Sequence, residues 1–378
     1  MESFSLPQPV PPGLRLAHLD GLRGTAIAFV LIHHLVQPMI STVPGTPSAY
    51  LASALTLTYT GVDLFFVLSG FLIGGILLDH RASPRLMPAF FWRRAARILP
   101  LACGCIGLGL GLHHLGLADG TPWPAAVYLF FGVNVWMAVA GQWGFQLLAP
   151  LWSLAIEEQF YLVTPWIIRF LSPSRLPWLF AGLIVAAPLA RWLILTVWPD
   201  GRFAASMLPL CRTDSLGLGL LGAWIMRQEA AQAWCRRHAA HLGIIFGATA
   251  VGGLYLSRIR AENAGPAMAW GGYTVVAVFY FLILLWTELY RDSGLTRALG
   301  CRPLRLLGRY SYFIYLFQGM IAGLIMNLCF HRGSDLTAPP ADLLQLATGL
   351  AGVLLAAAVS WHWLEAPLLA WSRRRTAY

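Results

Sequence analysis

The sequence contains no lysine, and all 26 of its basic residues are arginines. This absence excludes mechanisms in which a lysine forms a Schiff base or acts as the nucleophile. Charged residues of either sign are also scarce, at 11% of the chain, whereas soluble domains contain about 25%. Hydrophobic residues make up 58%, and mean hydropathy is +0.65. These values exclude a soluble globular fold.

Long apolar runs recur along the chain and indicate an all-α integral membrane protein. Eleven apolar segments can be distinguished, at residues 18–38, 54–78, 98–117, 124–140, 151–171, 176–198, 205–226, 242–257, 266–289, 306–328 and 343–365. There is no internal repeat and no loop long enough for a soluble domain. We expect one transmembrane domain over 18–370, after a Pro-rich cytoplasmic segment at 1–17 without a signal-peptide pattern and before a basic cytoplasmic tail at 371–378.

The arginines concentrate between the apolar segments, in loops 79–97, 227–241 and 290–305 and in the tail. The positive-inside rule places these loops in the cytoplasm and explains the net charge of +10 better than nucleic-acid binding does. Arg97 and Arg169 then lie on the same side, so an even number of spans separates them, yet three apolar segments do. We therefore predict a bundle of about ten spans with both termini cytoplasmic.

Two segments qualify as the one that is not a full span. Segment 124–140 is short, and segment 151–171 carries the adjacent carboxylates of Glu157 and Glu158. Non-helical backbone at membrane depth is tolerated only where it is buried in protein or lines a water-filled cavity. Either choice puts the two glutamates near a cavity.

The six cysteines lie mostly in or beside apolar segments. Cys103 and Cys105 are too close in sequence for an ordinary disulfide, and no second pair completes a metal-binding pattern. The paired histidines likewise have no matching set of acids or cysteines. We expect free, structural cysteines and no metal site.

The first apolar segment carries ionisable residues, which are costly in a bilayer and usually functional. His34 follows Arg23 by eleven residues, which returns to almost the same face of an α-helix roughly 16 Å further along its axis. A cation and an imidazole so placed suit a long anionic substrate, with His34 as the general base. His33 lies about 100° away and is the weaker candidate. The alternatives are that Asp20 and Arg23 only pair at the helix end and that His34 is a core histidine.

The second apolar segment combines glycines with two polar residues. Gly70, Gly74 and Gly75 form a face that allows close helix packing. Asp63 beside an apolar run needs a partner. Ser69 lacks the sequence context of a nucleophilic serine, so we interpret it as an interhelical hydrogen-bonding residue.

Two further clusters suit chemistry. Arg94 and Arg97 lie three residues apart before an apolar segment and could hold a phosphorylated donor through bidentate hydrogen bonds, unless they serve topology alone. Glu157, Glu158 and Tyr161 lie inside an apolar segment, where one acid could orient His34 or bind a sugar hydroxyl and the other could pair with an arginine.

Arg212 and Asp214 mark the entrance to another apolar segment. A structural ion pair between these two side chains is the alternative to a role in substrate binding.

These motifs, in this order, resemble the acyltransferase-3 family of membrane O-acyltransferases over essentially residues 16–370. The matching segments are Asp20-Gly-Leu-Arg23 followed by His34, Gly61 to Leu72, Arg93 to Pro100, Leu151 to Tyr161, Arg212-Thr-Asp214, Leu307 to Leu316, and Glu365-Ala-Pro367. One such motif is weak, but seven in register are highly specific.

The resemblance implies ten spans, a cytosolic acyl-CoA donor that is usually acetyl-CoA, and transfer to hydroxyls of cell-surface saccharides. It also implies functional roles for Arg23 and His34. Many members carry a histidine after the Tyr-Leu pair, where this chain has Phe317-Gln318, so a second catalytic histidine is excluded there, although Gln318 could hydrogen-bond a substrate. Because the chain stops at Tyr378, we expect no extracytoplasmic hydrolase-like domain of the kind that some relatives carry.

The resulting hypothesis is a bacterial inner-membrane O-acetyltransferase. It would use acetyl-CoA, with no permanently bound cofactor, to modify a lipid-linked saccharide or growing polysaccharide such as exopolysaccharide or O-antigen. Polysaccharide-assembly machinery is a candidate partner, and nucleic acid is not. Two alternatives stay open: a polytopic transporter of a small anionic solute, and an acyltransferase that modifies a small-molecule glycoside.

Overall fold

The computed structural model describes residues 17–43, 45–331, 336, 340–376 and 378, and the elements in these ranges are helical, without a strand. The predicted N-terminal segment 1–17 therefore lies, except for its last residue, outside the described residues. The longer helices are α1 (Ala17–Leu31), α3 (Gly61–Asp79), α4 (Leu86–His114), α7 (Leu151–Phe170), α8 (Leu176–Val197), α10 (Thr213–Ile225), α12 (Ala239–Arg258), α13 (Tyr273–Leu289), α15 (Arg302–Phe330), α16 (Leu343–Ser360) and α17 (Ala366–Arg375). The shorter ones are α2 (Pro47–Leu55), α5 (Ala125–Leu129), α6 (Val133–Ala140), α9 (Arg202–Met207), α11 (Glu229–Arg237) and α14 (Gly294–Leu299).

Eight helical stretches in the described ranges are long and apolar enough to cross a membrane. They cover Ala17–Met39, Pro47–Asp79, Leu86–His114, Pro173–Val197, Ala239–Arg258, Met268–Leu289, Arg302–Phe330 and Leu343–Arg375. The expected class, an all-α integral membrane protein, is confirmed. Two more helices, the charge-bearing α7 and the shorter α10, run through the same bundle. Counting them as spans would give ten, so the predicted number of about ten spans stays a prediction.

The segment 124–140 is not one continuous helix. It is divided into α5 and α6 around Phe131, whose φ of 52° places it in the left-handed region. The longer of the two, α6, has 8 residues and is therefore only about 12 Å long, too short to cross a bilayer. Segment 151–171, in contrast, forms the unbroken 20-residue helix α7.

Helix α4 begins at Leu86, twelve residues before the apolar segment that was predicted at 98–117. Leu86, Ala89 and Phe90 are buried, so this first part of the helix packs against the bundle. The arginines that were assigned to a loop at 79–97 therefore lie mostly on a helix. The predicted loops 227–241 and 290–305 likewise contain α11 and α14, and helix α17 extends through the predicted tail to Arg375.

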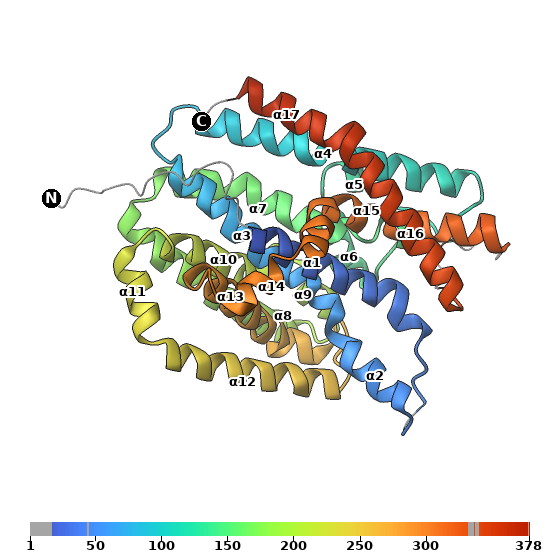
Figure 1. Cartoon of the computed structure of the whole chain (residues 1–378), viewed down its shortest axis with the longest axis horizontal. Helices are drawn as coiled ribbons and strands as arrows, with labels where there is room; N and C mark the ends of the chain where they lie inside the picture. Colours follow the sequence, from blue (N-terminus) through green and yellow to red (C-terminus); the bar gives the residue numbers. More distant parts are fainter. Residues whose placement is uncertain (1–16, 44, 332–335, 337–339, 377) are drawn as a thin grey trace.

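The centre of the bundle is formed by α1, α3, α10 and α15, between α12 on one side and α4 with α17 on the other (Figure 1). Glycines allow the closest approaches, as expected for the second apolar segment. A Cβ on Gly70 would lie 2.1 Å from the carbonyl oxygen of Leu216 in α10, and one on Gly24 would lie 2.0 Å from that of Leu304 in α15. This tight packing fixes the helices that bear the polar residues of the site.

Candidate active site

Five helices, α1, α3, α4, α7 and α15, line a cavity of about 100 Å³. Six of the residues singled out from the sequence line it. They are Arg23, Ser69, Arg94, Arg97, Glu157 and Tyr161. Apolar side chains, two further serines and two further tyrosines of α15, Tyr312 and Tyr315, complete the wall. Residues from distant parts of the chain thus converge on one site.

The cavity carries an excess of positive charge. Arg94 and Arg97, three residues apart on α4, both face it, as their spacing predicted. Arg23 enters from α1 and has Asp20 at 3.7 Å, a carboxylate whose side chain is 48% exposed. Arg97 has no hydrogen-bond or ion-pair partner within the described ranges. Three guanidinium groups therefore face one lining carboxylate, that of Glu157, which favours an anionic ligand.

Polar contacts connect α7 with α3 across the cavity wall. The Tyr161 hydroxyl donates a hydrogen bond to Glu157 at 2.9 Å and forms a second one with the Ser69 hydroxyl. Ser69 is therefore an interhelical hydrogen-bonding residue, as expected. The guanidinium of Arg94 lies 5.0 Å from the centre of the Tyr161 ring, within the range of a cation–π contact.

The two adjacent acids have different surroundings. Glu157 lines the cavity, whereas Glu158 does not, and its Oε1 is buried without a hydrogen-bond partner among the described residues. Neither acid hydrogen-bonds to His34, so the expectation that one of them orients this histidine is not met. The reason is geometric, because the neighbours of His34 come from α1 and α15 rather than from α7.

His34 lies beyond the cavity lining, in a π-helical turn that spans Ile32–Val36. The regular α-helix α1 ends at Leu31, so the rotation and distance between Arg23 and His34 are not those of one continuous α-helix. The Nδ1 atom of His34 is 2.9 Å from the carbonyl oxygen of Val30 and 3.3 Å from the Nε2 atom of Gln318.

The other histidine of this turn, His33, packs against His34 itself, with ring centres 4.9 Å apart. It hydrogen-bonds to Gln37 at 2.6 Å and packs its ring edge against Tyr59. The two histidines thus have different hydrogen-bond partners, but because their rings are in contact, the expectation that His33 faces elsewhere stays a prediction.

Gln318 is only 2% exposed and lies on α15 one turn after Tyr315, which lines the cavity. Its Oε1 has no hydrogen-bond partner in the described part of the chain. The structure thus places Gln318 beside His34 and three residues after the cavity-lining Tyr315.

Two buried ion pairs lie behind the cavity and join three helices. Arg212 pairs with Asp63 of α3 at 3.3 Å, and Asp214 pairs with Arg191 of α8 at 2.9 Å; all four side chains are at most 1% exposed. The suggested pair between Arg212 and Asp214 is therefore wrong: Arg212 ends the 3-10 turn Pro209–Arg212, Asp214 lies in the first turn of α10, and each has its partner on another helix. Arg212 is therefore the partner that the buried position of Asp63 was expected to need.

Arg191 was missed in the sequence, although a single arginine inside the apolar segment 176–198 was a usable signal. Its guanidinium also donates to Thr274 and to two backbone carbonyls, those of Ala269 and Cys211. None of these four ion-paired residues lines the cavity, so their contacts fasten α3, α8 and α10 together.

Comparison with known proteins gives one family. A family model described as an acyltransferase domain, acyltransferase family 3, matches residues 16–362. No solved structure matches.

Three curated relatives illustrate the similarity. The peptidoglycan O-acetyltransferase OatA of Listeria monocytogenes is 27% identical over 370 residues, which are 93% of this chain and 55% of the relative. The O-acetyltransferase OatA of Staphylococcus aureus is 26% identical over 80% of this chain and 50% of its own length. The putative peptidoglycan O-acetyltransferase YrhL of Bacillus subtilis is 29% identical over 79% of this chain and 47% of its own length. The chain therefore spans about half the length of these relatives.

Proposed function

The chain belongs to the acyltransferase-3 family, whose model covers nearly all of it, and we propose that it is a membrane O-acetyltransferase. It would move an acetyl group from cytosolic acetyl-CoA to a hydroxyl of a lipid-linked saccharide or a cell-surface polysaccharide. Two of the relatives are named for peptidoglycan, which supports a saccharide acceptor. The membrane would be the bacterial cytoplasmic membrane, with both termini in the cytoplasm.

The observation that carries the proposal is the convergence of Arg23, Arg94 and Arg97 on one cavity. Guanidinium groups hold phosphates by charge-assisted and often bidentate hydrogen bonds. The cavity lies at the end of the bundle where α1 begins and where the positive-inside rule places the cytoplasm. A phosphorylated donor arriving from the cytosol would therefore meet the three arginines first.

His34 is the proposed general base. Since the Val30 carbonyl can only accept a hydrogen bond, the neutral imidazole must carry its proton on Nδ1, which leaves Nε2 free to accept one. The oxygen of the acceptor hydroxyl would attack the thioester carbonyl while Nε2 takes the hydroxyl proton. The CoA thiolate would then leave. His34 is exposed, consistent with an acceptor that arrives from the other end of the bundle.

Gln318 is the proposed positioning residue for this base. With Nδ1 protonated, the amide NH₂ group at 3.3 Å has no acceptor on the imidazole. A half-turn of the amide exchanges its nitrogen with the unpartnered Oε1, which would then accept from Nδ1–H together with Val30. Gln318 would thereby stabilise the tautomer in which Nε2 is the base.

The test is acetyl transfer by the full chain in lipid nanodiscs, with acetyl-CoA as donor and a soluble N-acetylglucosamine-containing peptidoglycan fragment as acceptor probe. We expect release of CoA that is stimulated by the acceptor and abolished in His34→Ala. A transporter would show no CoA release, and that result would overturn the proposal. A small-molecule glycoside as the natural acceptor would appear as stimulation by such a glycoside but not by the peptidoglycan fragment.

A further inference from the structure

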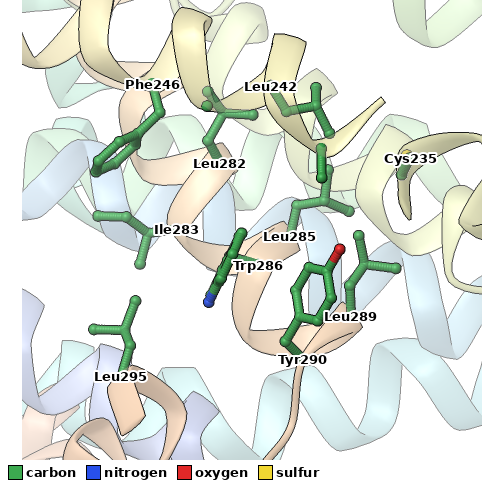
Figure 2. A pocket seen from close by; sticks show the side chains of 12 residues that line it. Cys235, Leu242, Phe246, Leu282, Ile283, Leu285, Trp286, Leu289, Tyr290 and Leu295 are labelled. Atoms are coloured by element: carbon green, nitrogen blue, oxygen red, sulfur yellow. The ribbon is translucent and has the colours of Figure 1, made fainter. Parts of the chain in front are cut away.

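A second and larger cavity, of about 270 Å³, lies between α12 and α13 and shares no residue with the candidate active site. Figure 2 shows Leu242 and Phe246 of α12 facing Leu282 and Trp286 of α13 across it. Its twelve lining residues are almost all apolar. An apolar cavity of about 150 Å³ already binds a molecule as large as benzene, so this one has room for a longer hydrocarbon.

The cavity lies at the lipid-facing edge of the bundle. Only one of the 20 residues of α12, Leu256, is buried, while apolar side chains such as Ile244 and Leu254 are about 70% exposed. In a membrane protein such a helix face contacts acyl chains. The natural solvent of this cavity is therefore the hydrocarbon of the bilayer, and not water.

Aromatic residues indicate at which level of the membrane the cavity lies. Trp286 and Tyr290 line it, with ring centres 4.4 Å apart, and the exposed Trp234 lies on the adjacent α11. Tryptophan and tyrosine gather at the level of the lipid headgroups. The end of the cavity near Tyr290 and α11 is thus expected at the membrane surface.

Arginines stand next in the sequence to lining residues at this same end. Cys235 of α11 lines the cavity and is followed by the exposed Arg236 and Arg237. Tyr290 is followed by Arg291, which is paired with Glu288 at 2.8 Å. Both segments are among those that the positive-inside rule assigns to the cytoplasm. Exposed arginines close in sequence to an apolar cavity match an anionic headgroup attached to an acyl chain.

We propose that this cavity binds one acyl chain of an anionic phospholipid of the cytoplasmic leaflet, whose phosphate contacts Arg236 and Arg237. A neutral lipid would satisfy the apolar wall but not the arginines. A soluble anion would satisfy the arginines but leave the cavity unfilled. The site is independent of acyl transfer, so its test does not need an active enzyme.

The experiment measures which lipid the full chain retains after extraction from nanodiscs that contain equal amounts of phosphatidylcholine and phosphatidylglycerol, by native mass spectrometry. We expect retention of phosphatidylglycerol about tenfold more often than phosphatidylcholine, because arginines near the surface attract anionic lipids. Arg236→Gln combined with Arg237→Gln should abolish this preference while a lipid is still retained. Arg85→Gln, an exposed arginine elsewhere on the expected cytoplasmic side, is the matched control.

The second part of the experiment fills the cavity with a larger side chain. Gly243 lines the cavity, and a Cβ there meets nothing within 4 Å, so Gly243→Leu should occupy the space and reduce lipid retention at least tenfold. Gly247→Leu, on the same helix, also in open space and outside the lining, should retain lipid like the wild type. Ala239→Leu is a second filling variant if Gly243→Leu does not fold.

Two results would overturn the proposal. One is equal retention of the two lipids by the wild-type protein, which would show that the arginines do not select the headgroup. The other is unchanged retention in folded Gly243→Leu and Ala239→Leu, which would place the bound lipid, or a protein partner, elsewhere on the surface.

Discussion

Replacing Arg97 with lysine tests whether the cavity holds the phosphates of the donor. The substitution keeps the positive charge, and therefore the topology, but replaces a planar fork of donors by a single ammonium group. Hydrogen bonds to charged groups contribute about 1.5–3 kcal/mol. Loss of one of two such bonds, about 1.5 kcal/mol, corresponds to roughly a tenfold weaker affinity for acetyl-CoA. Arg97→Ala, which also loses the charge, should be weaker still.

The assay is acetyl-CoA binding to the purified protein in nanodiscs, with acetyl-pantetheine, which lacks the nucleotide and its phosphates, as a second ligand. We expect Arg97→Lys to lose affinity for acetyl-CoA and to keep its weaker affinity for acetyl-pantetheine. Arg85→Lys, exposed and outside the cavity, is the matched control and should change neither. Unchanged acetyl-CoA affinity with normal turnover would refute the phosphate clamp and leave Arg97 a topological role.

Further changes test the other parts of the site and the topology. His34→Ala should lower acetyl transfer at least about 100-fold, the usual contribution of a general base, while His33→Ala should have a smaller effect. The reverse result would show that His33, and not His34, is the base. Gln318→Leu should lower kcat roughly tenfold, since one hydrogen bond of about 1–1.5 kcal/mol is lost, and increase the fraction of the other His34 tautomer in ¹⁵N NMR spectra, whereas Gln318→Glu keeps the acceptor and should rescue the tautomer. Breaking the buried pair by Arg212→Leu should lower stability by about 3–5 kcal/mol, and Arg212→Leu combined with Asp63→Leu should recover much of it in thermal unfolding. Reporter fusions should place the carboxyl terminus in the cytoplasm and the loop after the first span outside; a periplasmic carboxyl terminus would mean that the number of spans is odd.

The membrane class and most helix positions could be predicted from the sequence. Apolar runs of this length have no stable place in water, and the backbone inside a bilayer must satisfy its own hydrogen bonds, so these runs become helices. The predicted segment 18–38 corresponds to the helical stretch Ala17–Met39, and 306–328 lies within Arg302–Phe330. Boundaries failed where one end of a helix carries charged residues, as in α4, because the apolar segment then begins later than the helix does.

Local spacing also predicted parts of the site. Arg94 and Arg97 face the same cavity because residues three apart lie on one side of a helix, and this relation needs no tertiary information. The same rule could not decide between Glu157 and Glu158, since either one can face inward. It could not give the geometry between Arg23 and His34, because the π-helical turn at Ile32–Val36 replaces the α-helix assumed there.

By itself, then, the sequence determined that this chain is a helical membrane protein, that it resembles the acyltransferase-3 family, and which ionisable residues lie in apolar segments. Only the tertiary structure decided which of them meet. The observed pairing, Arg212 with Asp63 and Arg191 with Asp214 instead of Arg212 with Asp214, depends on how α3, α8 and α10 cross. The neighbour of His34 is decided by α15, about 280 residues further along the chain. A charge buried in a low-dielectric interior takes the nearest oppositely charged partner in space, and sequence distance has no influence on that choice.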